Sequence, residues 1–423
     1  MKLEIMKMNL SKYVRVIQGN DSTILFNTIN ASIIEFTYQK SNDINILLQE
    51  MTDDEVNYLR ENLFFISEQN AMKLFFTEPV SPVLNITISL TEFCNLKCRY
   101  CYEGNLIRRS VISPETIDNI VQYIYAILSR DKRKSIVNID LIGGEPLLEI
   151  EQIQYLIQKL NPINDVTIYF TLETNGTLFS KQVQEVFKEM NVLVSVPLTI
   201  ETDQNTMRPF KDGDASYITI VENLAKAKAF FESEKHQLVL RYNAHKENIK
   251  SFGEFFKTVS KTIPYHFEIE LARIINYPYN SPCSTLSHTE YSEWFLKTYF
   301  EYTEDAYSRN RFLLPGKRYS SCTAYMPDDI KIHADGSLAL CNAWIPQNRC
   351  GNIEWLLCGK TKKDIFSAGE LYRPDVDNEC YACPDLFLCG GKKICNRDNP
   401  CEFVDFDINR YIAQYVYGRK GNQ

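Results

Sequence analysis

The chain has 423 residues, of which 44% are hydrophobic and 24% are charged, so it holds enough apolar residues to bury a core in each of two or three domains. Its formal net charge of -8 and its pI near 5.4 argue against a nucleic-acid partner bound through a general basic surface. No stretch is long and apolar enough for a signal peptide or a membrane span, so we expect a cytoplasmic protein without a membrane partner, whose 13 cysteines bind metal rather than form disulfides.

The N-terminal segment, residues 1–78, contains no cysteine and no histidine. Residues 13–17 and 23–27 are β-type runs on either side of a turn at residues 19–22, and together they predict a hairpin. A helix is expected to follow over residues 52–62. The segment is therefore predicted to form a small α+β domain.

Residues 79–310 contain strands that alternate with helices, the pattern that builds a parallel sheet or barrel. The apolar stripe over residues 117–128 predicts a helix with Ser113 as its cap and Pro114 in its first turn, and similar stripes cover residues 153–160 and 183–190. Six strands are predicted, at residues 83–90, 137–142, 166–172, 192–200, 238–243 and 267–274. The fold class is α/β, a partial (β/α)6 barrel of the TIM type.

Three cysteines directly follow the first of these strands, in the run Cys94-Asn95-Leu96-Lys97-Cys98-Arg99-Tyr100-Cys101. Iron-sulfur clusters are normally held by four thiolates, so three of them leave one iron open to a ligand that is not protein. The triplet also lies at the end of the barrel where active sites are built. We therefore expect a cluster that binds a substrate or cofactor.

Polar or glycine-rich segments end several later strands. Gly143-Gly144-Glu145 ends the second strand, where two glycines would let backbone approach a ligand and Glu145 could accept its ammonium group. The segment from Glu173 to Gly176 ends the third strand, and each of these two segments also fits an ordinary turn. Candidate ligand contacts on the fourth and fifth strands are Ser195, Arg241 and Asn243, with Asn248 shortly after.

Residues 203–217 form the connection after the fourth strand. Read by itself, this segment is a helix entry with Asp214 or Ser216 as the cap. The buried stripe of that helix would consist of Tyr217, Ile220, Val221 and Leu224.

The C-terminal region, residues 311–423, holds a second concentration of cysteine. Cys322 is followed by Gly336 and Cys341, and then by Cys380, Cys383, Cys389, Cys395 and Cys401. Either auxiliary iron-sulfur clusters or a four-sulfur zinc site would use such thiols.

The CxxxCxxC spacing with an aromatic residue before the last cysteine resembles the signature of the radical S-adenosylmethionine (SAM) enzymes. The resemblance implies that Cys94, Cys98 and Cys101 hold a 4Fe-4S cluster whose open iron binds SAM, which is cleaved to a 5′-deoxyadenosyl radical. It also implies a set of SAM-binding residues, namely Tyr100, Gly143, Gly144, Glu145, Asn175, Ser195 and Arg241. The run from Arg208 to Tyr217 resembles the R-x4-G-x2-S-[FY] loop of peptide- and protein-modifying members.

The seven C-terminal cysteines resemble the SPASM domain, which holds two auxiliary 4Fe-4S clusters in several radical SAM enzymes. The resemblance implies an outer cluster on Cys380, Cys383, Cys389 and Cys401, and an inner cluster on Cys322, Cys341 and Cys395. Here five residues separate Cys389 from Cys395 where the family generally has three. Two full clusters need an eighth thiolate, which Cys283, Cys350 or Cys358 would supply unless the inner cluster keeps an open iron.

The resemblance implies a maturase that installs a side-chain crosslink, a thioether or a carbon–carbon bond, in a precursor peptide. Flavodoxin or ferredoxin would be its electron donor, and no catalytic residue is assigned. The N-terminal segment resembles the winged-helix element that adds a peptide leader as an extra strand, although a structural cap fits equally. An anaerobic sulfatase-maturating enzyme is the nearest alternative, opposed by Asn342, which stands where those enzymes carry an aspartate base. A non-catalytic electron carrier or zinc-bound scaffold is a third.

Overall fold

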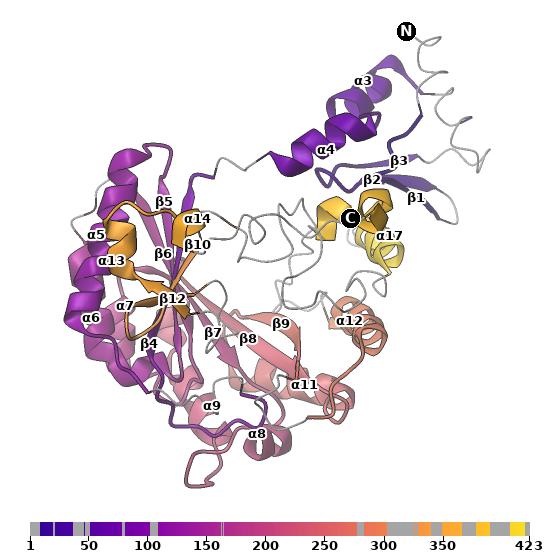
Figure 1. Cartoon of the computed structure of the whole chain (residues 1–423). Coiled ribbons are helices and arrows are strands. Elements are labelled where there is room, and N and C mark those ends of the chain that lie inside the picture. Colours follow the sequence, from indigo (N-terminus) through magenta and orange to yellow (C-terminus); the bar gives the residue numbers. More distant parts are fainter. Residues whose placement is uncertain are drawn as a thin grey trace. The chain divides into compact units, whose positions relative to one another are not determined.

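The structure is a computed structural model in which the chain divides into two compact units, drawn together in Figure 1. The larger unit consists of Ser81–Asn310 and Pro327–Ala368, and the smaller unit combines Met1–Val80, Arg311–Met326 and Gly369–Gln423. The residues that the structure describes are 9–19, 22–36, 46, 51–77, 81–101, 109–161, 163, 165–276, 283–302, 326, 329–339, 349–365, 378–389 and 407–418. The three-domain division expected from the sequence stays a prediction.

A nine-stranded sheet forms the centre of the larger unit, in the order β12-β11-β10-β4-β5-β6-β7-β8-β9. Its six consecutive parallel strands are β4 (Val83–Thr91), β5 (Ile136–Gly143), β6 (Thr167–Glu173), β7 (Asn191–Pro197), β8 (His236–Ala244) and β9 (Glu268–Arg273). The predicted six-stranded α/β partial barrel is confirmed. The fourth strand ends at Pro197, three residues before its predicted end.

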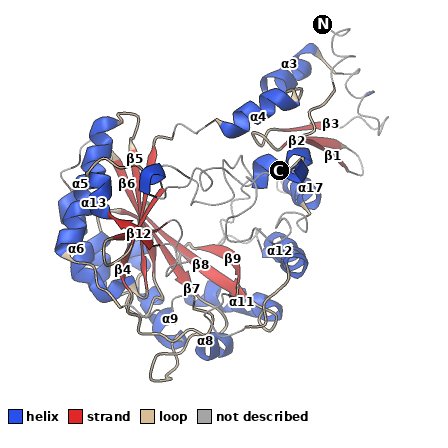
Figure 2. Cartoon of the chain, viewed as in Figure 1, coloured by secondary structure: helices blue, strands red, loops and turns tan. Residues whose placement is uncertain are grey.

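Helices connect these strands and surround them in Figure 2. They include α5 (Pro114–Arg130), α6 (Ile150–Leu160), α7 (Lys181–Phe187), α8 (Glu201–Met207), α9 (Tyr217–Lys226), α10 (Lys228–Phe231) and α11 (Phe252–Thr262), with the short 3-10 turns η1 (Pro146–Glu149) and η2 (Ile249–Ser251). The predicted start of α5 is confirmed, because Ser113 accepts a hydrogen bond from the Thr116 amide and Pro114 is the first helical residue. The helix α12 (His288–Tyr302) follows β9.

The two faces of the parallel strands differ in polarity. Along β4, Leu84, Ile86 and Ile88 are fully or almost fully buried, whereas Asn85 and Thr87 point to the opposite face. The strand register carries this second face across the sheet: Thr87 pairs with Asp140, Asp140 with Thr171, Glu173 with Ser195, and Arg241 with Glu270. The inner face of the partial barrel therefore carries many polar side chains, although the same register also brings Leu193 and Val239 onto it.

One parallel strand was not predicted from the sequence. The strand β10 (Asp329–Ile332) pairs with β4 and continues through β11 (Ser337–Ala339) to β12 (Arg349–Asn352). It is only four residues long, and two of those are charged. The Lys331 ammonium lies 3.1 Å from a carboxylate oxygen of Asp329. Asp329 and Lys331 share one face and the buried Ile330 and Ile332 the other, so the strand alternates as expected and was missed only because of its short length. The short helices α13 (Ile353–Leu357) and α14 (Lys362–Ile365) follow β12.

The smaller unit contains a three-stranded antiparallel sheet, β1 (Val14–Gln18), β2 (Thr23–Asn27) and β3 (Ile33–Phe36), with β2 in the middle. The predicted hairpin and helix are confirmed. The helix is α3 (Asp53–Glu61), which begins with a capping box between Thr52 and Glu55 and is followed by α4 (Glu68–Phe76). The core of the sheet and α3 consists of Leu25, Phe36, Met51, Val56, Leu59 and Phe64.

C-terminal residues complete this unit through α15 (Asn378–Ala382), α16 (Leu386–Cys389) and α17 (Ile408–Gly418). The Phe387 ring packs edge-on against Tyr13 at 4.9 Å and against Phe75 at 5.4 Å between centroids. The Arg15 guanidinium binds both carboxylate oxygens of Asp385, one of them at 2.6 Å from Nε. The segment that carries Cys380, Cys383 and Cys389 is thus anchored to the N-terminal sheet and helices.

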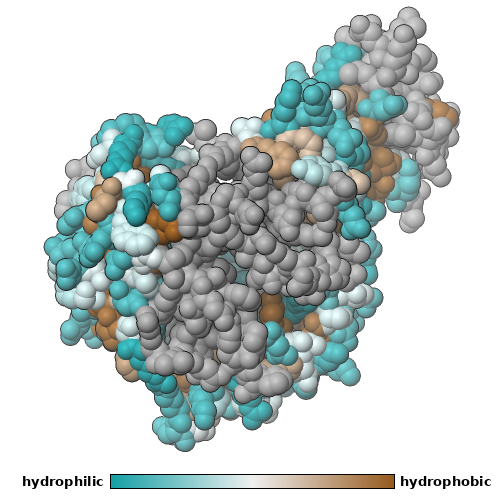
Figure 3. All heavy atoms as spheres, viewed as in Figure 1, coloured by the Kyte–Doolittle hydropathy of each residue, from teal (hydrophilic) through white to brown (hydrophobic). Residues whose placement is uncertain are grey.

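The described surface mixes polar and apolar side chains. On the face shown in Figure 3, apolar side chains occupy small spots among polar ones. Exposed apolar residues such as Val111, Leu148 and Ile218 come from well-separated parts of the sequence. No helix of the described residues has the length and apolarity that a membrane crossing needs.

Candidate functional site

The three cysteines Cys94, Cys98 and Cys101 lie on the loop that leaves the carboxyl end of β4, and each thiol is partly exposed. The Cys94 sulfur accepts hydrogen bonds from the Leu96 amide at 3.4 Å and from Asn175 Nδ2 at 3.8 Å. Burial raises the pKa of the Cys94 thiol to about 11 in the absence of metal. As a ligand to iron, Cys94 would therefore lose its proton when it binds the metal, as thiolate ligands do.

The Gly143-Gly144 turn at the end of β5 holds this cysteine loop. The amides of Gly144 and Glu145 donate to the carbonyls of Thr91 and Phe93, each at 2.8 Å. A Cβ at position 144 would lie 2.3 Å from the Phe93 carbonyl oxygen, and Gly143 has a φ of 143°. The two glycines were expected to let backbone approach a ligand, and in the structure it is the cysteine loop that approaches them closely. The expected SAM contact stays a prediction.

Glu145 is fully buried and its carboxylate is engaged within the chain. It accepts hydrogen bonds from Thr174 Oγ1 at 2.7 Å, from the Asn175 amide at 2.7 Å and from the Leu147 amide at 3.0 Å. Burial raises the pKa of this carboxyl, and the three hydrogen bonds and the nearby Arg208 oppose that rise. The carboxylate thereby connects the ends of β5 and β6, and its expected role toward an ammonium group stays a prediction.

Asn175 connects the end of β6 to the same loop. Its amide nitrogen donates to Asn95 Oδ1 at 2.8 Å, and its Oδ1 accepts from the backbone and the hydroxyl of Thr177. Asn95 in turn donates to the Thr177 hydroxyl at 2.8 Å. The segment Thr174–Thr177 therefore determines how residues 94 and 95 are presented.

The connection after α8 pairs with the cysteine loop along its other side. The Arg99 amide donates to the Met207 carbonyl and the Lys97 amide to the Pro209 carbonyl, each at 2.9 Å, and Leu96 forms an isolated bridge with Phe210. The expected helix entry is confirmed, with Ser216 as the cap of α9 and the predicted buried stripe on that helix. The Ser216 hydroxyl donates to the Arg208 carbonyl at 2.7 Å.

Arg208 is enclosed at this junction, with 4% of its surface exposed. Its guanidinium donates to the Pro197 carbonyl at the end of β7 and hydrogen-bonds to Cys98. Burial alone would lower the pKa of Arg208, but the field of Tyr100, Cys98 and Cys94 holds it above its ordinary value. A permanent positive charge therefore lies beside the cysteine triplet.

Further polar groups line the inner face close to the strand ends. Ser195 Oγ lies beside the Glu173 carboxylate, yet within the described residues it has no partner in hydrogen-bond geometry. A buried hydroxyl without a partner fits a site that a ligand hydroxyl completes. Arg241 Nη1 lies 3.4 Å from Glu270 Oε1, and both side chains are partly exposed. Burial raises the pKa of Glu173, and Arg241 opposes the rise.

Tyr100 joins the cysteine loop to the end of β8, because its hydroxyl accepts a hydrogen bond from Asn243 Nδ2 at 3.0 Å. The Asn248 amide nitrogen donates to the Asn243 carbonyl and to Asp203 Oδ2, both at 3.0 Å. Tyr100, Asn243 and Asn248 were predicted as separate candidates. The structure brings them together in one network that ends at Asp203.

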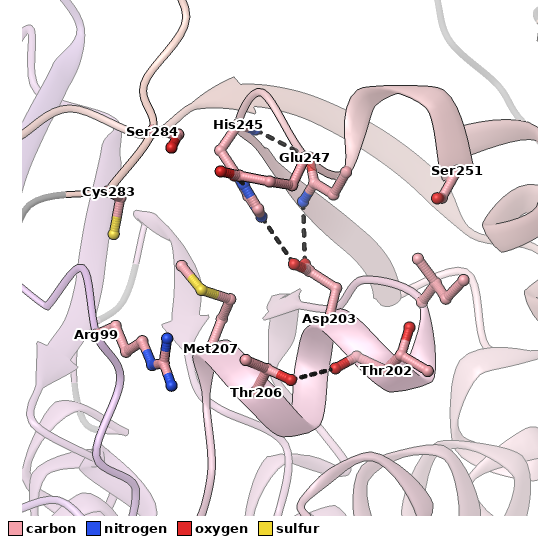
Figure 4. Close-up of a pocket in the computed structure, with 12 residues that line it drawn as sticks. Arg99, Thr202, Asp203, Thr206, Met207, His245, Glu247, Ser251, Cys283 and Ser284 are labelled. Atoms are coloured by element: carbon pink, nitrogen blue, oxygen red, sulfur yellow. Dashed lines mark hydrogen bonds and ion pairs between the residues drawn. The ribbon is translucent and has the colours of Figure 1, made fainter.

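A cavity of about 570 Å³ lies at the other end of this network. Figure 4 shows Asp203 and His245 pointing toward each other on one side, with Arg99 and Cys283 on the opposite side. His245 Nε2 is 2.7 Å from Asp203 Oδ1, and His245 Nδ1 is 2.5 Å from Glu247 Oε2. Burial alone would lower the pKa of His245, but the two carboxylates raise it above its ordinary value. This carboxylate–imidazole–carboxylate cluster had no recognisable spacing in the sequence.

Only some of the C-terminal candidates lie among the described residues. Cys380, Cys383 and Cys389 are partly exposed, and the Cys383 sulfur accepts a hydrogen bond from the Asp385 amide at 3.4 Å. Of the spare cysteines, Cys283 lines the cavity, Cys358 is exposed, and the backbone of Cys350 is in β12. Cys322, Cys341, Asn342, Cys395 and Cys401 lie outside the described residues.

The described residues fit an iron-sulfur cluster at the Cys94 loop. Their donors are three thiols on one loop, with N–H groups at one sulfur and a buried cation beside another. Within the described ranges, no three His, Cys, Asp or Glu side chains are close enough to share a single metal ion. Thiolates that bind different irons of a cluster stand further apart than thiolates that share one ion, so this spacing is compatible with a cluster.

Comparisons with known proteins agree with this geometry. Residues 88–259 match the model of the radical SAM superfamily. A cysteine-type anaerobic sulfatase-maturating enzyme of Clostridium perfringens is 23% identical over 370 residues, which are 79% of this chain and 95% of that protein. The alignments with other curated relatives, among them a probable GTP 3′,8-cyclase of Pyrococcus abyssi, span only about half of those proteins.

Solved structures share the fold over most of the chain. Native anSMEcpe with bound AdoMet superimposes with a TM-score of 0.61 at 19% identity, covering 81% of this chain and 99% of that one. SuiB of Streptococcus suis bound to S-adenosylmethionine gives a TM-score of 0.52 at 16% identity, covering 94% and 98% of the two chains. SuiB bound to the precursor peptide SuiA gives a TM-score of 0.50 at the same identity, covering 93% and 98%.

Proposed function

We propose that this chain, which belongs to the radical SAM superfamily and is a radical SAM enzyme, abstracts a hydrogen atom from a precursor peptide and installs a crosslink on a side chain. The observation that carries the proposal is the three-cysteine loop at the strand ends, held beside a polar inner sheet face, in a chain that also has an antiparallel N-terminal sheet. The crosslink would be a thioether or a carbon–carbon bond.

In the proposed site, Cys94, Cys98 and Cys101 hold a 4Fe-4S cluster, and SAM is bound by Tyr100, Gly143, Gly144, Glu145, Asn175, Ser195 and Arg241. When bound, these groups would supply a 5′-deoxyadenosyl radical. The chain's own part is positional. The turns after β5 and β6 and the loop after α8 fix the cysteine loop from three sides. Ser195 and Arg241 face the barrel interior, where they would orient the ligand.

Two auxiliary 4Fe-4S clusters belong to the same proposal. Cys380, Cys383, Cys389 and Cys401 would hold the outer cluster, and Cys322, Cys341 and Cys395 the inner one. Forming a crosslink removes two hydrogen atoms from the peptide. One of them leaves as an atom, and the other leaves as a proton and an electron, so the reaction needs an electron acceptor of this kind. A flavodoxin or ferredoxin would reduce the first cluster.

The peptide is supported as substrate by the smaller unit. The strands β1 and β3 each pair only with β2 among the described residues, so an extended leader would have a sheet edge on which to add a strand. The SuiB structures, one of them bound to a precursor peptide, cover 94% and 93% of this chain. The uncovered part is shorter than residues 1–80, so some of that segment has a counterpart in SuiB. The match to anSMEcpe leaves 19% uncovered, since it covers 81%.

Anaerobic sulfatase maturation is the second candidate. It is favoured by coverage of 95% of the Clostridium perfringens enzyme at the sequence level. It is opposed by Asn342, because an amide cannot accept a proton as the expected aspartate would. The two candidates differ in their products, which mass spectrometry separates.

The test is an anaerobic assay of the reconstituted protein with SAM, a reductant and the peptide encoded beside its gene. The proposal predicts 5′-deoxyadenosine together with a peptide that has lost two hydrogen atoms and gained a bond between two residues. Conversion of a cysteine or serine in a sulfatase peptide to formylglycine would instead establish the second candidate. Protein that neither binds nor cleaves SAM would exclude both and favour a scaffold or electron carrier.

A further inference from the structure

We propose that Arg208 is a fixed positive charge that sets the reduction potential of the cluster held by Cys94, Cys98 and Cys101. The inference rests on the proposed cluster assignment and adds a positioning and electrostatic residue to it. Arg208 is not a ligand and is not among the residues expected to contact SAM. Its role would be exerted through Cys98.

The backbone fixes where Arg208 lies. It is the first residue after α8, and its two neighbours are bound to the cysteine loop, since the carbonyls of Met207 and Pro209 accept from Arg99 and Lys97, each at 2.9 Å. These two hydrogen bonds flank position 208 and hold it opposite Cys98. The side chain then extends between the loop and the end of β7, where it donates to the Pro197 carbonyl.

The charge of Arg208 has few compensating partners. A buried guanidinium is costly unless an anion or several acceptors accompany it. Glu145 is close enough to feel its field, but the Glu145 oxygens already accept from Thr174, Asn175 and Leu147. Its guanidinium lies against Cys98, the residue opposite position 208 between the two flanking hydrogen bonds. The thiolates of the loop are therefore the natural counter-charge.

The effect on a cluster follows from the charges. A cluster on three thiolates becomes more negative by one unit when it accepts an electron, and its potential depends on net charge and on hydrogen bonds to the sulfurs. A cation held in a low-dielectric site stabilises the more negative form. Arg208 would thus make the cluster easier to reduce, and SAM cleavage begins from the reduced cluster.

The test is an EPR-monitored redox titration of the full-length reconstituted protein, following the signal that responds to SAM. Arg208→Met removes the charge but keeps an apolar side chain of moderate length, and it should lower the equilibrium constant for one-electron reduction at least tenfold, a shift of about 59 mV. Arg208→Lys keeps the charge and should stay within threefold of the original protein. Lys97→Met removes one exposed charge from the same loop and should leave the potential unchanged.

The outcomes are distinct. An unchanged potential in Arg208→Met would overturn the proposal, even if the variant melts at a lower temperature, since a purely structural role through Pro197 affects stability but not potential. If Arg208→Met fails to hold the cluster, Arg208→Lys decides: a retained cluster with the original potential supports a role for charge, and a lost cluster contradicts it. Absence of any SAM-responsive signal in the original protein would instead refute the proposed function.

Discussion

The Arg15 guanidinium binds both oxygens of the Asp385 carboxylate, although 370 residues separate the two in the sequence. Arg15 belongs to β1, and Asp385 lies between Cys383 and Cys389. Thr28 reinforces this contact by donating to the Pro384 carbonyl at 2.8 Å. The N-terminal sheet and the cysteine segment are therefore one folding unit, so a change in either should be felt by the other.

Arg15→Met should lower the free energy of unfolding of the smaller unit by about 2 kcal/mol, because it leaves a largely buried carboxylate without its bidentate partner. Urea unfolding followed by tyrosine fluorescence measures the change. Lys226→Gln breaks an exposed pair with Glu222 and serves as the control, with an expected loss of about 0.5 kcal/mol or less. Equal losses in the two variants would show that the Arg15–Asp385 contact stabilises the protein no more than an exposed ion pair does.

Gly144→Ala should disrupt the cysteine loop, because its Cβ would lie 2.3 Å from the Phe93 carbonyl oxygen and cannot be accommodated without moving residues 93 and 94. We expect loss of the SAM-responsive iron signal and a destabilisation of about 1–3 kcal/mol. Gly359→Ala is the matched control, since a Cβ there meets nothing within 4 Å and only its φ of 85° opposes the change. It should keep the cluster.

Replacing Cys94, Cys98 and Cys101 together by Ala should abolish 5′-deoxyadenosine formation while iron bound at the C-terminal cysteines remains. Three 4Fe-4S clusters correspond to about twelve irons per chain, and the triple variant should retain about eight. Iron analysis and product chromatography give the two readouts. Full SAM cleavage by the variant would contradict the assignment, and about four irons in the original protein would remove the auxiliary clusters.

The Asp203–His245 contact predicts a pH dependence of stability. The pKa of His245 is raised above its ordinary value of 6.5 by Asp203 and Glu247, despite the opposing effect of burial. Its contribution to stability is therefore complete below pH 6.5 and is lost as the pH rises through the raised value. The pKa of Asp203 is lowered despite the opposing effect of burial, so its contribution is lost only as the pH falls well into the acid range.

Urea unfolding of His245→Gln between pH 6 and pH 9 tests this sign. The stability difference between the original protein and the variant should shrink as the pH increases. His236→Gln is the control, because the ring nitrogens of His236 face the carbonyls of Phe230 and Phe187 rather than carboxylates. A difference that stays constant with pH would show that His245 does not change its charge on folding.

The periodic part of the fold was predictable from the sequence. The alternation of the six strands, the cap at Ser113 and the capping box at Thr52 are local patterns, and local patterns determine such elements. The strand β10 alternates polar and apolar residues as a half-buried strand does, but it is only four residues long and was therefore missed.

Some members of the candidate site were predictable from the sequence, but the Asp203–His245–Glu247 cluster and the arrangement of the site were not. The cysteine triplet and the segments at Gly144 and Asn175 were identified by type and position. That Gly144 and Asn175 hold the cysteine loop, and that Arg208 faces Cys98, depends on contacts between loops far apart in the sequence. Such contacts follow from the register of neighbouring strands, which becomes known only when the sheet is assembled.

The pairing of β10 with β4 also has a consequence for biosynthesis. Thr87 and Lys331 are 244 residues apart, so the strand that leads into the cysteine loop has no neighbour on one side until most of the chain has left the ribosome. An unpaired apolar strand is a template for aggregation. We therefore expect chaperones to bind the nascent chain at this edge, and iron to be inserted only after translation has passed β10.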